Sequence, residues 1–236
     1  MNQTKLSVVI PVYNEEDNIP IIIKEYQKYV NKYSFEIIFA ADKGSSEKTK
    51  KIIKKYSKKH AFINYIISSE KGYGISIFSG LKSAKGEFIC WTHADLQTDP
   101  NDTIKAFELI KKQKNPKKTF IKGKRYRRPF FDKFFEFGMS VFETIILRTL
   151  VYDINAQPNL FHKSFLKLMK NPPKDFSFDL YAYYLTRTNN YHIKRFPVLF
   201  PKRIYGESHW NTGMKERIKF IKRTINFTFG LKKHIR

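Results

Sequence analysis

The chain has one cysteine among its 236 residues, and no internal repeat or low-complexity linker interrupts it. A single cysteine excludes an internal disulfide and is compatible with a reducing compartment. Cys90 lies in the apolar run Phe88–Trp91, which predicts a buried structural thiol rather than a nucleophile. The length suits one α/β domain with a short appendage.

Long apolar runs are also missing. No uncharged stretch reaches the roughly 18 residues that a membrane-spanning helix needs, and the best candidate, residues 134–152, contains Glu136, Glu143 and Arg148. The apolar run at residues 6–12 is too short for a signal peptide and is followed directly by polar residues. We therefore expect a soluble or peripheral protein of the cytoplasm, not an integral membrane protein.

Acidic residues are scarce, because 21 Asp and Glu stand against 45 Lys and Arg, giving a net charge of +24. Residues 111–133 contain 11 Lys and Arg and one acid, and residues 201–236 contain 10 and two acids. Such clusters attract polyanions, which include nucleic acid, anionic lipid head groups and phosphorylated substrates. A solvated surface without a partner is the alternative interpretation of the same charge.

Apolar strand-like runs alternate with helical segments through the first half of the chain. The pattern predicts strands at residues 6–12, 35–41, 62–67, 87–91 and 119–123, and helices ending near residues 30, 59, 84 and 113. Asp99 followed by Pro100 is typical of a helix N-cap and first helical residue. The alternation predicts an α/β fold with a mostly parallel sheet, which binds ligands beyond the carboxyl ends of its strands.

Polar groups follow three of those strands, in the segments at residues 11–15, 41–45 and 91–100. In the third, His93, Asp95 and Gln97 alternate, so an extended chain would point all three in one direction. An imidazole, a carboxylate and an amide oxygen can hold a divalent cation whose shell is completed by diphosphate oxygens. A polar loop without a metal remains the alternative.

The order of these segments resembles family 2 glycosyltransferases. SVVIPVYNEEDNI, DKGSSEKT, GLKSAKGEF and HADLQTDP are followed by KGKRY, DINAQ and RIYGES, so that the resemblance covers about residues 5–210. It is similar to the branch that contains dolichyl-phosphate mannosyltransferase and bacterial polyprenyl-phosphate sugar transferases. The resemblance implies a GT-A fold, which is Rossmann-like with helices flanking a mostly parallel sheet, followed by a basic helical tail.

The resemblance also implies roles for single residues. Asp95 would be the principal ligand of a Mg or Mn ion, assisted by Gln97 and His93, and Asp42 would hydrogen-bond the base. Cations and a metal near the diphosphate stabilise the charge that develops on the leaving group. The expected catalytic set is Asp153, Arg125 and Arg203, and the expected nucleotide-sugar site is Pro11, Tyr13, Glu15, Asp42, His93, Ala94, Asp95, Lys202 and Ser208.

Asp153 stands where family members carry an aspartate near the acceptor, and its alternative role is to cap the turn before Pro158. The chain departs from the family pattern at Lys43, where a second Asp is common, and at His93, which replaces the first Asp of the metal motif. A neutral histidine can still bind a metal or the donor. The two changes are also compatible with a non-catalytic nucleotide-sugar binder.

Two segments are candidates for a membrane surface. Residues 130–137 contain five phenylalanines beside arginines, a composition that suits the boundary between head groups and acyl chains. Residues 141–150 instead favour a helix packed on the sheet. The basic segment at residues 211–236 is either an amphipathic anchor or a helix that closes the domain.

The resemblance implies an inverting glycosyltransferase that moves a sugar from a nucleotide-diphosphate sugar to a polyprenyl phosphate, and we expect it to work at the inner face of a membrane. A sugar hydroxyl in bacterial polysaccharide or lipopolysaccharide assembly is the alternative acceptor. We expect a domain at residues 1–210, with a nucleotide-sugar half (1–98) and an acceptor half (99–210), and a tail at 211–236. Nucleic acid is not an expected partner, because the chain has no signature of an RNP, KH or helix-turn-helix module.

Overall fold

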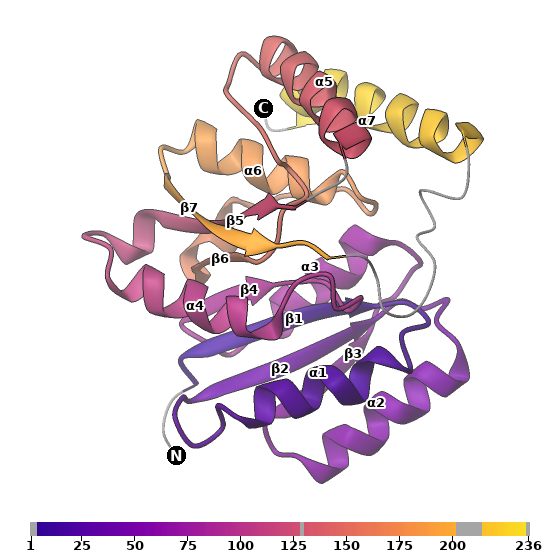
Figure 1. The fold of residues 1–236 in the computed structure, drawn as a ribbon, viewed down its shortest axis with the longest axis vertical. Helices are drawn as coiled ribbons and strands as arrows, with labels where there is room; N and C mark the ends of the chain where they lie inside the picture. The colour runs from indigo at the N-terminus through magenta and orange to yellow at the C-terminus, as the bar shows by residue number, and fades with distance from the viewer. Residues whose placement is uncertain (1–3, 128–129, 202–213, 235–236) are drawn as a thin grey trace.

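The computed structural model describes residues 4–127, 130–201 and 214–234, and in these ranges seven strands form one sheet (Figure 1). The strands are β1 (Leu6–Val12), β2 (Phe35–Ala41), β3 (Ile63–Ile67), β4 (Phe88–Trp91), β5 (Thr119–Tyr126), β6 (Asn159–His162) and β7 (His192–Leu199). The α-helices are α1 (Asn18–Gln27), α2 (Glu47–Lys59), α3 (Tyr73–Ser83), α4 (Pro100–Lys111), α5 (Phe130–Leu147), α6 (Phe178–Thr188) and α7 (Met214–His234). Short 3-10 helices lie at Pro116–Lys118 and Lys163–Leu168.

The strand order is β3-β2-β1-β4-β6-β5-β7. β1 pairs in parallel with β2 and β4, and β2 pairs in parallel with β3. β6 runs antiparallel to both β4 and β5, and β7 is parallel to β5. The carboxyl ends of the other six strands therefore meet at one edge, together with the amino end of β6. The predicted α/β fold with a mostly parallel sheet is confirmed.

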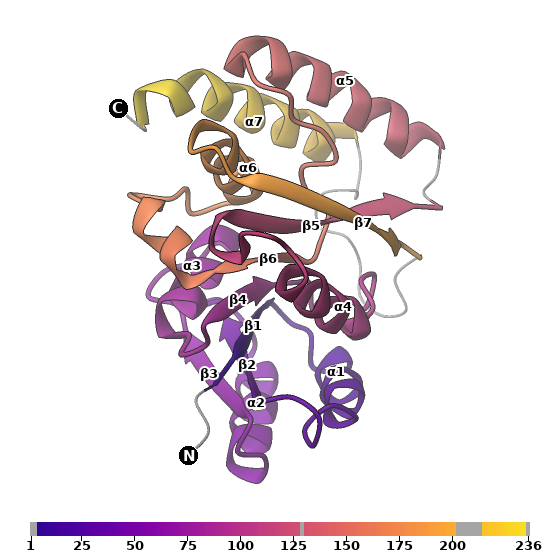
Figure 2. The ribbon, with the colours of Figure 1, turned by 90° about the vertical axis from the view of Figure 1, so that its left-hand side faces the viewer.

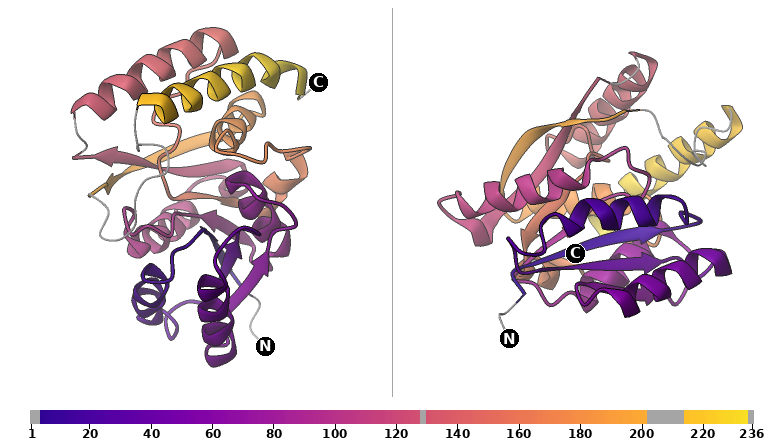
Figure 3. Two further views of the ribbon diagram at one scale, coloured as in Figure 1. Left: turned by 90° about the vertical axis from the view of Figure 1, so that its right-hand side faces the viewer. Right: turned by 60° about the horizontal axis from the view of Figure 1, so that its bottom comes forward.

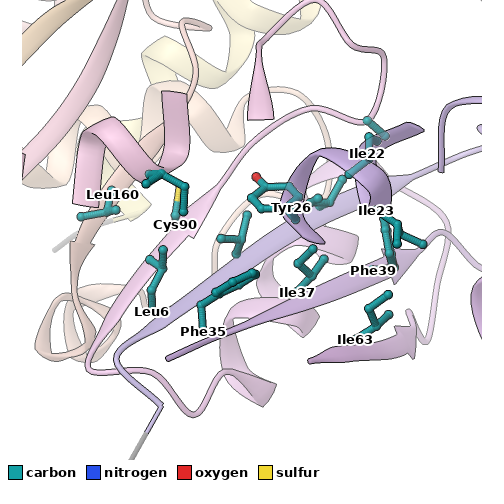
Figure 4. Close-up of a cluster of buried hydrophobic side chains, with 14 of the residues drawn as sticks. Leu6, Ile22, Ile23, Tyr26, Phe35, Ile37, Phe39, Ile63, Cys90 and Leu160 are labelled. Carbon is teal, nitrogen blue, oxygen red and sulfur yellow. The ribbon is translucent and has the colours of Figure 1, made fainter. Parts of the chain in front are cut away.

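Apolar side chains form a core on each face of the sheet. One cluster joins the sheet to α1, α2 and α4, and Figure 4 shows Ile22, Ile23 and Tyr26 of α1 above the strands. The other cluster joins the sheet to α3 and α6 and includes Leu231 of α7. Cys90 is fully buried in the first cluster, and burial raises the pKa of its thiol. The prediction of a structural thiol is consistent with this position.

The predicted elements of the first half all occur, with ends displaced by a few residues. Asp99 caps α4 by accepting a hydrogen bond from the backbone N–H of Asn101 at 2.8 Å. The strands β6 and β7 were not predicted. β6 has only four residues, too few to show a period, and β7 contains Pro197, which lacks the N–H of a central strand. β7 can carry a proline because it is an edge strand of the described sheet.

Helices α5 and α7 lie side by side as an outer layer beyond α6 (Figures 2 and 3). The expectation that residues 141–150 pack on the sheet is wrong for Val141, Ile145 and Leu150, which are 43%, 67% and 59% exposed. The buried face of α5 instead carries Glu143, and burial raises the pKa of this carboxyl group to about 8. The prediction assumed that the apolar face of this helix is its buried face, whereas part of that face is exposed and an acid is buried.

Among the described residues, no helix combines the length and the apolar character needed to cross a membrane.

Candidate functional site

Loops from β1 and β2 form the first part of the candidate site, at the shared edge of the sheet. Pro11 is buried within β1, whereas Tyr13, just beyond its end, is 44% exposed. The side chain of Asn14 accepts a hydrogen bond from the backbone N–H of Ser46 at 2.8 Å, which joins the two loops. Glu15 accepts a hydrogen bond from Asn18 at the start of α1. The predicted nucleoside-binding groups thus stand at the end of β1.

Asp42 lies directly after β2 and is 7% exposed. Its Oδ1 accepts a hydrogen bond from the N–H of Gly44 at 2.7 Å, and its Oδ2 accepts one from the N–H of Gly72 at 2.6 Å. The carboxylate therefore shapes its own loop and fixes it to the start of α3. Its predicted bond to the base of a nucleotide stays a prediction, which would use the remaining acceptor positions of the two oxygens.

The loop after β4 turns instead of running straight. Leu96 has a φ of +57°, and the backbone N–H of Gln97 bonds to Oδ1 of Asp95 at 3.1 Å. The side-chain amide of Gln97 donates a hydrogen bond to the carbonyl of Pro201 at 2.9 Å. The extended geometry that placed His93, Asp95 and Gln97 on one side is therefore wrong. Asp95 and Ala94 are buried at this edge, 5% and 4% exposed.

Aromatic rings support the same loop from α3. The ring of His93 stacks with the ring of Tyr73, with centroids 6.1 Å apart, and Tyr73 stacks on Phe176 at 4.6 Å. Burial and the neighbouring Asp179 carboxylate raise the pKa of the Tyr73 hydroxyl well above its ordinary value. Tyr73 therefore keeps its hydroxyl proton, and the hydroxyl accepts a hydrogen bond from Gln157 Nε2 at 3.5 Å. Neither Tyr73 nor Phe176 was predicted, because nothing in their local sequence points to the loop.

The side chains of this loop could hold a divalent cation only together with phosphate oxygens of a bound substrate. Within residues 4–127, 130–201 and 214–234 no three His, Cys, Asp or Glu side chains gather in a geometry that could hold a metal. One carboxylate with substrate phosphate oxygens is, however, the usual way in which Mg²⁺ is held in phosphate-binding sites. Asp95 can supply that carboxylate, with His93 beside it. The metal roles of Asp95, Gln97 and His93 stay predictions.

Arg125, near the carboxyl end of β5, lies between two acids. Its Nε donates to Oδ1 of Asp153 at 2.6 Å, its backbone N–H donates to Oδ2 of Asp153 at 2.8 Å, and its Nη2 lies 2.9 Å from Glu136. The arginine side chain is 7% exposed and that of Asp153 is 14% exposed. Burial opposes the ionisation of Asp153, but the charge and hydrogen bonds of Arg125 outweigh it and lower the pKa of Asp153. The carboxylate thus holds Arg125 in place, and its role near the acceptor stays a prediction.

Lys122 is a functional candidate that sequence reasoning did not single out. Its side chain is 1% exposed and donates three hydrogen bonds of 2.6–2.8 Å, to the carbonyls of Ile154 and Ala156 and to Oδ1 of Asn159. Burial and nearby Arg195 lower the pKa of Lys122 to about 7. The signal was present, since a lysine inside an apolar strand must find oxygen partners.

The glycine after Lys122 is required by packing, because a Cβ at Gly123 would lie 2.1 Å from the carbonyl oxygen of Gln157. β5 and the loop at residues 153–158 are therefore in direct contact. The predicted site residues Lys202, Arg203 and Ser208 lie outside the described residues. Pro201 is the last residue described before them, and its carbonyl oxygen accepts the hydrogen bond from the side chain of Gln97.

Comparison with known proteins identifies the family of the chain. The family model described as "Glycosyl transferase family 2" matches residues 7–158, which is more than half of the chain. A dolichyl-phosphate beta-glucosyltransferase from Trichomonas vaginalis is 26% identical over 59% of this chain and 47% of its own length. An undecaprenyl-phosphate 4-deoxy-4-formamido-L-arabinose transferase from Pseudomonas savastanoi is 30% identical over 41% of this chain and 30% of its own. The matches thus span less than half the length of these relatives.

The fold is similar to that of solved enzymes. Glucosyl-3-phosphoglycerate synthase from Mycobacterium tuberculosis, in a complex with Mn²⁺, uridine diphosphate and glucosyl-3-phosphoglycerate, gives a TM-score of 0.73. The superposition covers 97% of this chain and 79% of that chain at 12% sequence identity. Another structure of the same enzyme gives a TM-score of 0.74 at 14% identity. At such identities the likeness concerns the fold alone.

Proposed function

Because the chain belongs to glycosyl transferase family 2, we propose that it transfers a sugar from a nucleotide-diphosphate sugar to a polyprenyl phosphate, with inversion at the transferred carbon. The donor would lie over the loops that follow β1, β2 and β4. A Mg²⁺ or Mn²⁺ ion held there by Asp95 would stabilise the charge that develops on the leaving diphosphate. The named acceptors of two similar proteins, dolichyl phosphate and undecaprenyl phosphate, support the choice of acceptor.

The state of Asp153 is the observation that carries this proposal. A sugar hydroxyl needs a positioned general base, which works best when its pKa is near the operating pH. A phosphate monoester has a second pKa of about 6 and needs no base at neutral pH. The pKa of Asp153 is lowered, and both of its oxygens accept hydrogen bonds from Arg125. Such a carboxylate is a poor base but a good orienting partner for an arginine that would receive a phosphate.

A screen of donors and acceptors tests the proposal. We expect nucleoside diphosphate release when a nucleotide sugar, Mn²⁺ or Mg²⁺ and a short polyprenyl phosphate are combined, and loss of that release with EDTA. Turnover on an oligosaccharide but on no polyprenyl phosphate would eliminate the proposed acceptor. Donor binding without turnover on any acceptor would identify a non-catalytic nucleotide-sugar binder.

A lipid acceptor requires a protein surface that meets the membrane, and we propose that α5 and α7 provide it at the inner face. Phe137, Val141 and Ile145 follow each other at four-residue intervals on one face of α5 and are 69%, 43% and 67% exposed. Phe229 of α7 is 58% exposed, and its ring meets that of Phe142 at 6.0 Å. Lys222 and Arg223 are exposed on the same helix. Apolar side chains beside cations suit an anionic bilayer.

Vesicle co-sedimentation tests this surface. The protein should bind vesicles of anionic phospholipid more strongly than vesicles of phosphatidylcholine, and added salt should weaken the binding by screening. Ile145→Asp should reduce binding, because it places a charge on the apolar face. Lys222→Glu should reduce it too, since each basic residue contributes about 1 kcal/mol near such a surface.

Tyr65→Asp is the matched control for the vesicle experiment. Tyr65 is 40% exposed on β3, at the opposite end of the sheet from the helical layer. Its replacement should leave vesicle binding unchanged. Equal binding to neutral and anionic vesicles, or binding to neither, would contradict the membrane proposal.

A further inference from the structure

The first turn of α6 carries a buried carboxylate, Asp179, which is 3% exposed. Its Oδ1 accepts hydrogen bonds from Trp91 Nε1 at 3.1 Å, Gln157 Nε2 at 2.9 Å and Asn159 Nδ2 at 3.5 Å. The three donors come from the end of β4, from the loop before β6 and from the start of β6. Asp179 therefore joins segments that are distant in the sequence and that border both halves of the candidate site.

On the donor side, Asp179 is connected to two residues that border the Asp95 loop, Trp91 and Tyr73. Trp91 is the last residue of β4, four residues before Asp95. The Tyr73 hydroxyl accepts a hydrogen bond at 3.5 Å from Gln157 Nε2, which also donates to Asp179, and the Tyr73 ring stacks with that of His93. A displacement of Asp179 would thus reach the metal loop through both Trp91 and Tyr73.

On the acceptor side, the same carboxylate anchors the loop that contains Asp153. Gln157, which bonds Asp179, also accepts a hydrogen bond from Asn159 at 2.6 Å. Asn159 in turn accepts one from Lys122 at 2.8 Å, and Lys122 bonds the carbonyls of Ile154 and Ala156. The loop is therefore bound at several points to a network that ends at Asp179.

We propose that Asp179 is a positioning residue of the transfer reaction, which holds the Asp95 loop and the Asp153 loop at the separation that donor and acceptor require. The inference rests on the proposed function, because it assigns these loops to donor and acceptor. A buried carboxylate with several donors is costly to disturb. A displacement of about 1 Å between reacting groups can lower a rate by ~10²-fold, so a modest shift in this network would have a measurable effect.

Asp179→Asn tests the proposal, because the amide keeps the shape but removes the negative charge that strengthens the hydrogen bonds from Trp91, Gln157 and Asn159 to Oδ1. At saturating donor and acceptor we expect kcat to fall by at least ~10-fold and up to ~10²-fold. The KM for the donor should change less than kcat, since the hydrogen bonds of Asp179 go to Trp91, Gln157 and Asn159 and not to the groups assigned to donor binding. Turnover is measured with whichever acceptor the screen finds active. The ratio of variant kcat to wild-type kcat can therefore be measured even if no polyprenyl phosphate is an acceptor.

Glu36→Gln is the matched control. Glu36 is 5% exposed and accepts hydrogen bonds from Ser7, Asn64 and the backbone of Lys85, but it lies near the amino end of β2, away from the site. Both variants should lower the melting temperature, and only Asp179→Asn should lower kcat per folded molecule. Equal kcat values in the two variants would show a merely structural role and overturn the proposal.

Gln157→Met provides a second variant in case Asp179→Asn does not fold. It keeps the side-chain length but removes the hydrogen bonds to Asp179, Asn159 and Tyr73, and kcat should fall by about tenfold or more. An unchanged kcat in Gln157→Met would also overturn the proposal.

Discussion

Asp95→Asn should abolish turnover while leaving the protein folded. A metal at the leaving diphosphate contributes several kcal/mol of transition-state stabilisation, which corresponds to ~10³-fold or more in rate. The fold should survive because an amide oxygen can still accept the hydrogen bond that Oδ1 of Asp95 receives from Gln97. We would measure nucleoside diphosphate release with saturating donor, and the affinity for Mn²⁺ by paramagnetic resonance in the presence of nucleoside diphosphate. Both should fall, and EDTA should reproduce the loss in the unaltered protein.

Asp99→Asn is the matched control, four residues along the same loop. Asp99 is exposed and caps α4, and asparagine caps a helix as well as aspartate does. This variant should keep wild-type turnover and metal affinity. His93→Ala should have an intermediate effect, because Asp95 and the donor oxygens remain. If Asp95→Asn retained most of the activity, the assignment of the metal to this loop would be wrong.

Arg125→Lys should lower kcat by ~10²-fold with a polyprenyl phosphate acceptor. Lysine keeps the charge but loses the planar fork that pairs with Asp153 and Glu136, so an acceptor phosphate would be misplaced. Asp153→Asn should cost less, about tenfold, because the ion pair with Arg125 becomes a hydrogen bond from the guanidinium to a neutral amide. Steady-state rates with short polyprenyl phosphates at fixed saturating donor would compare the two variants.

The order of these two effects separates the two acceptor classes. With a hydroxyl acceptor, Asp153→Asn would remove a general base and cost at least ~10²-fold, more than Arg125→Lys. Arg127→Lys makes the same substitution at an exposed position just beyond β5 and should leave the rate unchanged. A larger loss in Asp153→Asn than in Arg125→Lys would therefore refute the phosphate acceptor.

The sequence by itself determined the α/β class, the first five strands and the positions of the loops between them. Buried parallel strands appear in the sequence as apolar runs. Helix caps are also local signals, as Asp99 and Pro100 show at the start of α4. The positions of Asp42, Asp95 and Asp153 also followed from the order of the segments and their resemblance to a family. The contacts of these residues could not be predicted from the sequence, because the partners of a loop side chain often lie far away in the chain.

Only the tertiary structure decided those partners. The chain turns at Leu96, where an extended segment was predicted. Asp153 accepts a hydrogen bond from Arg125, and Val141 and Ile145 of α5 are exposed, although they were predicted to pack on the sheet. Lys122 could have been noticed as a lysine inside an apolar strand, but its partners could not be predicted, and Asp179 is an ordinary charged residue until burial removes water and makes its hydrogen bonds obligatory. Their partners are 20 to 88 residues away in the sequence. Local patterns carry no information about such pairings, which arise when β6 enters the sheet between β4 and β5.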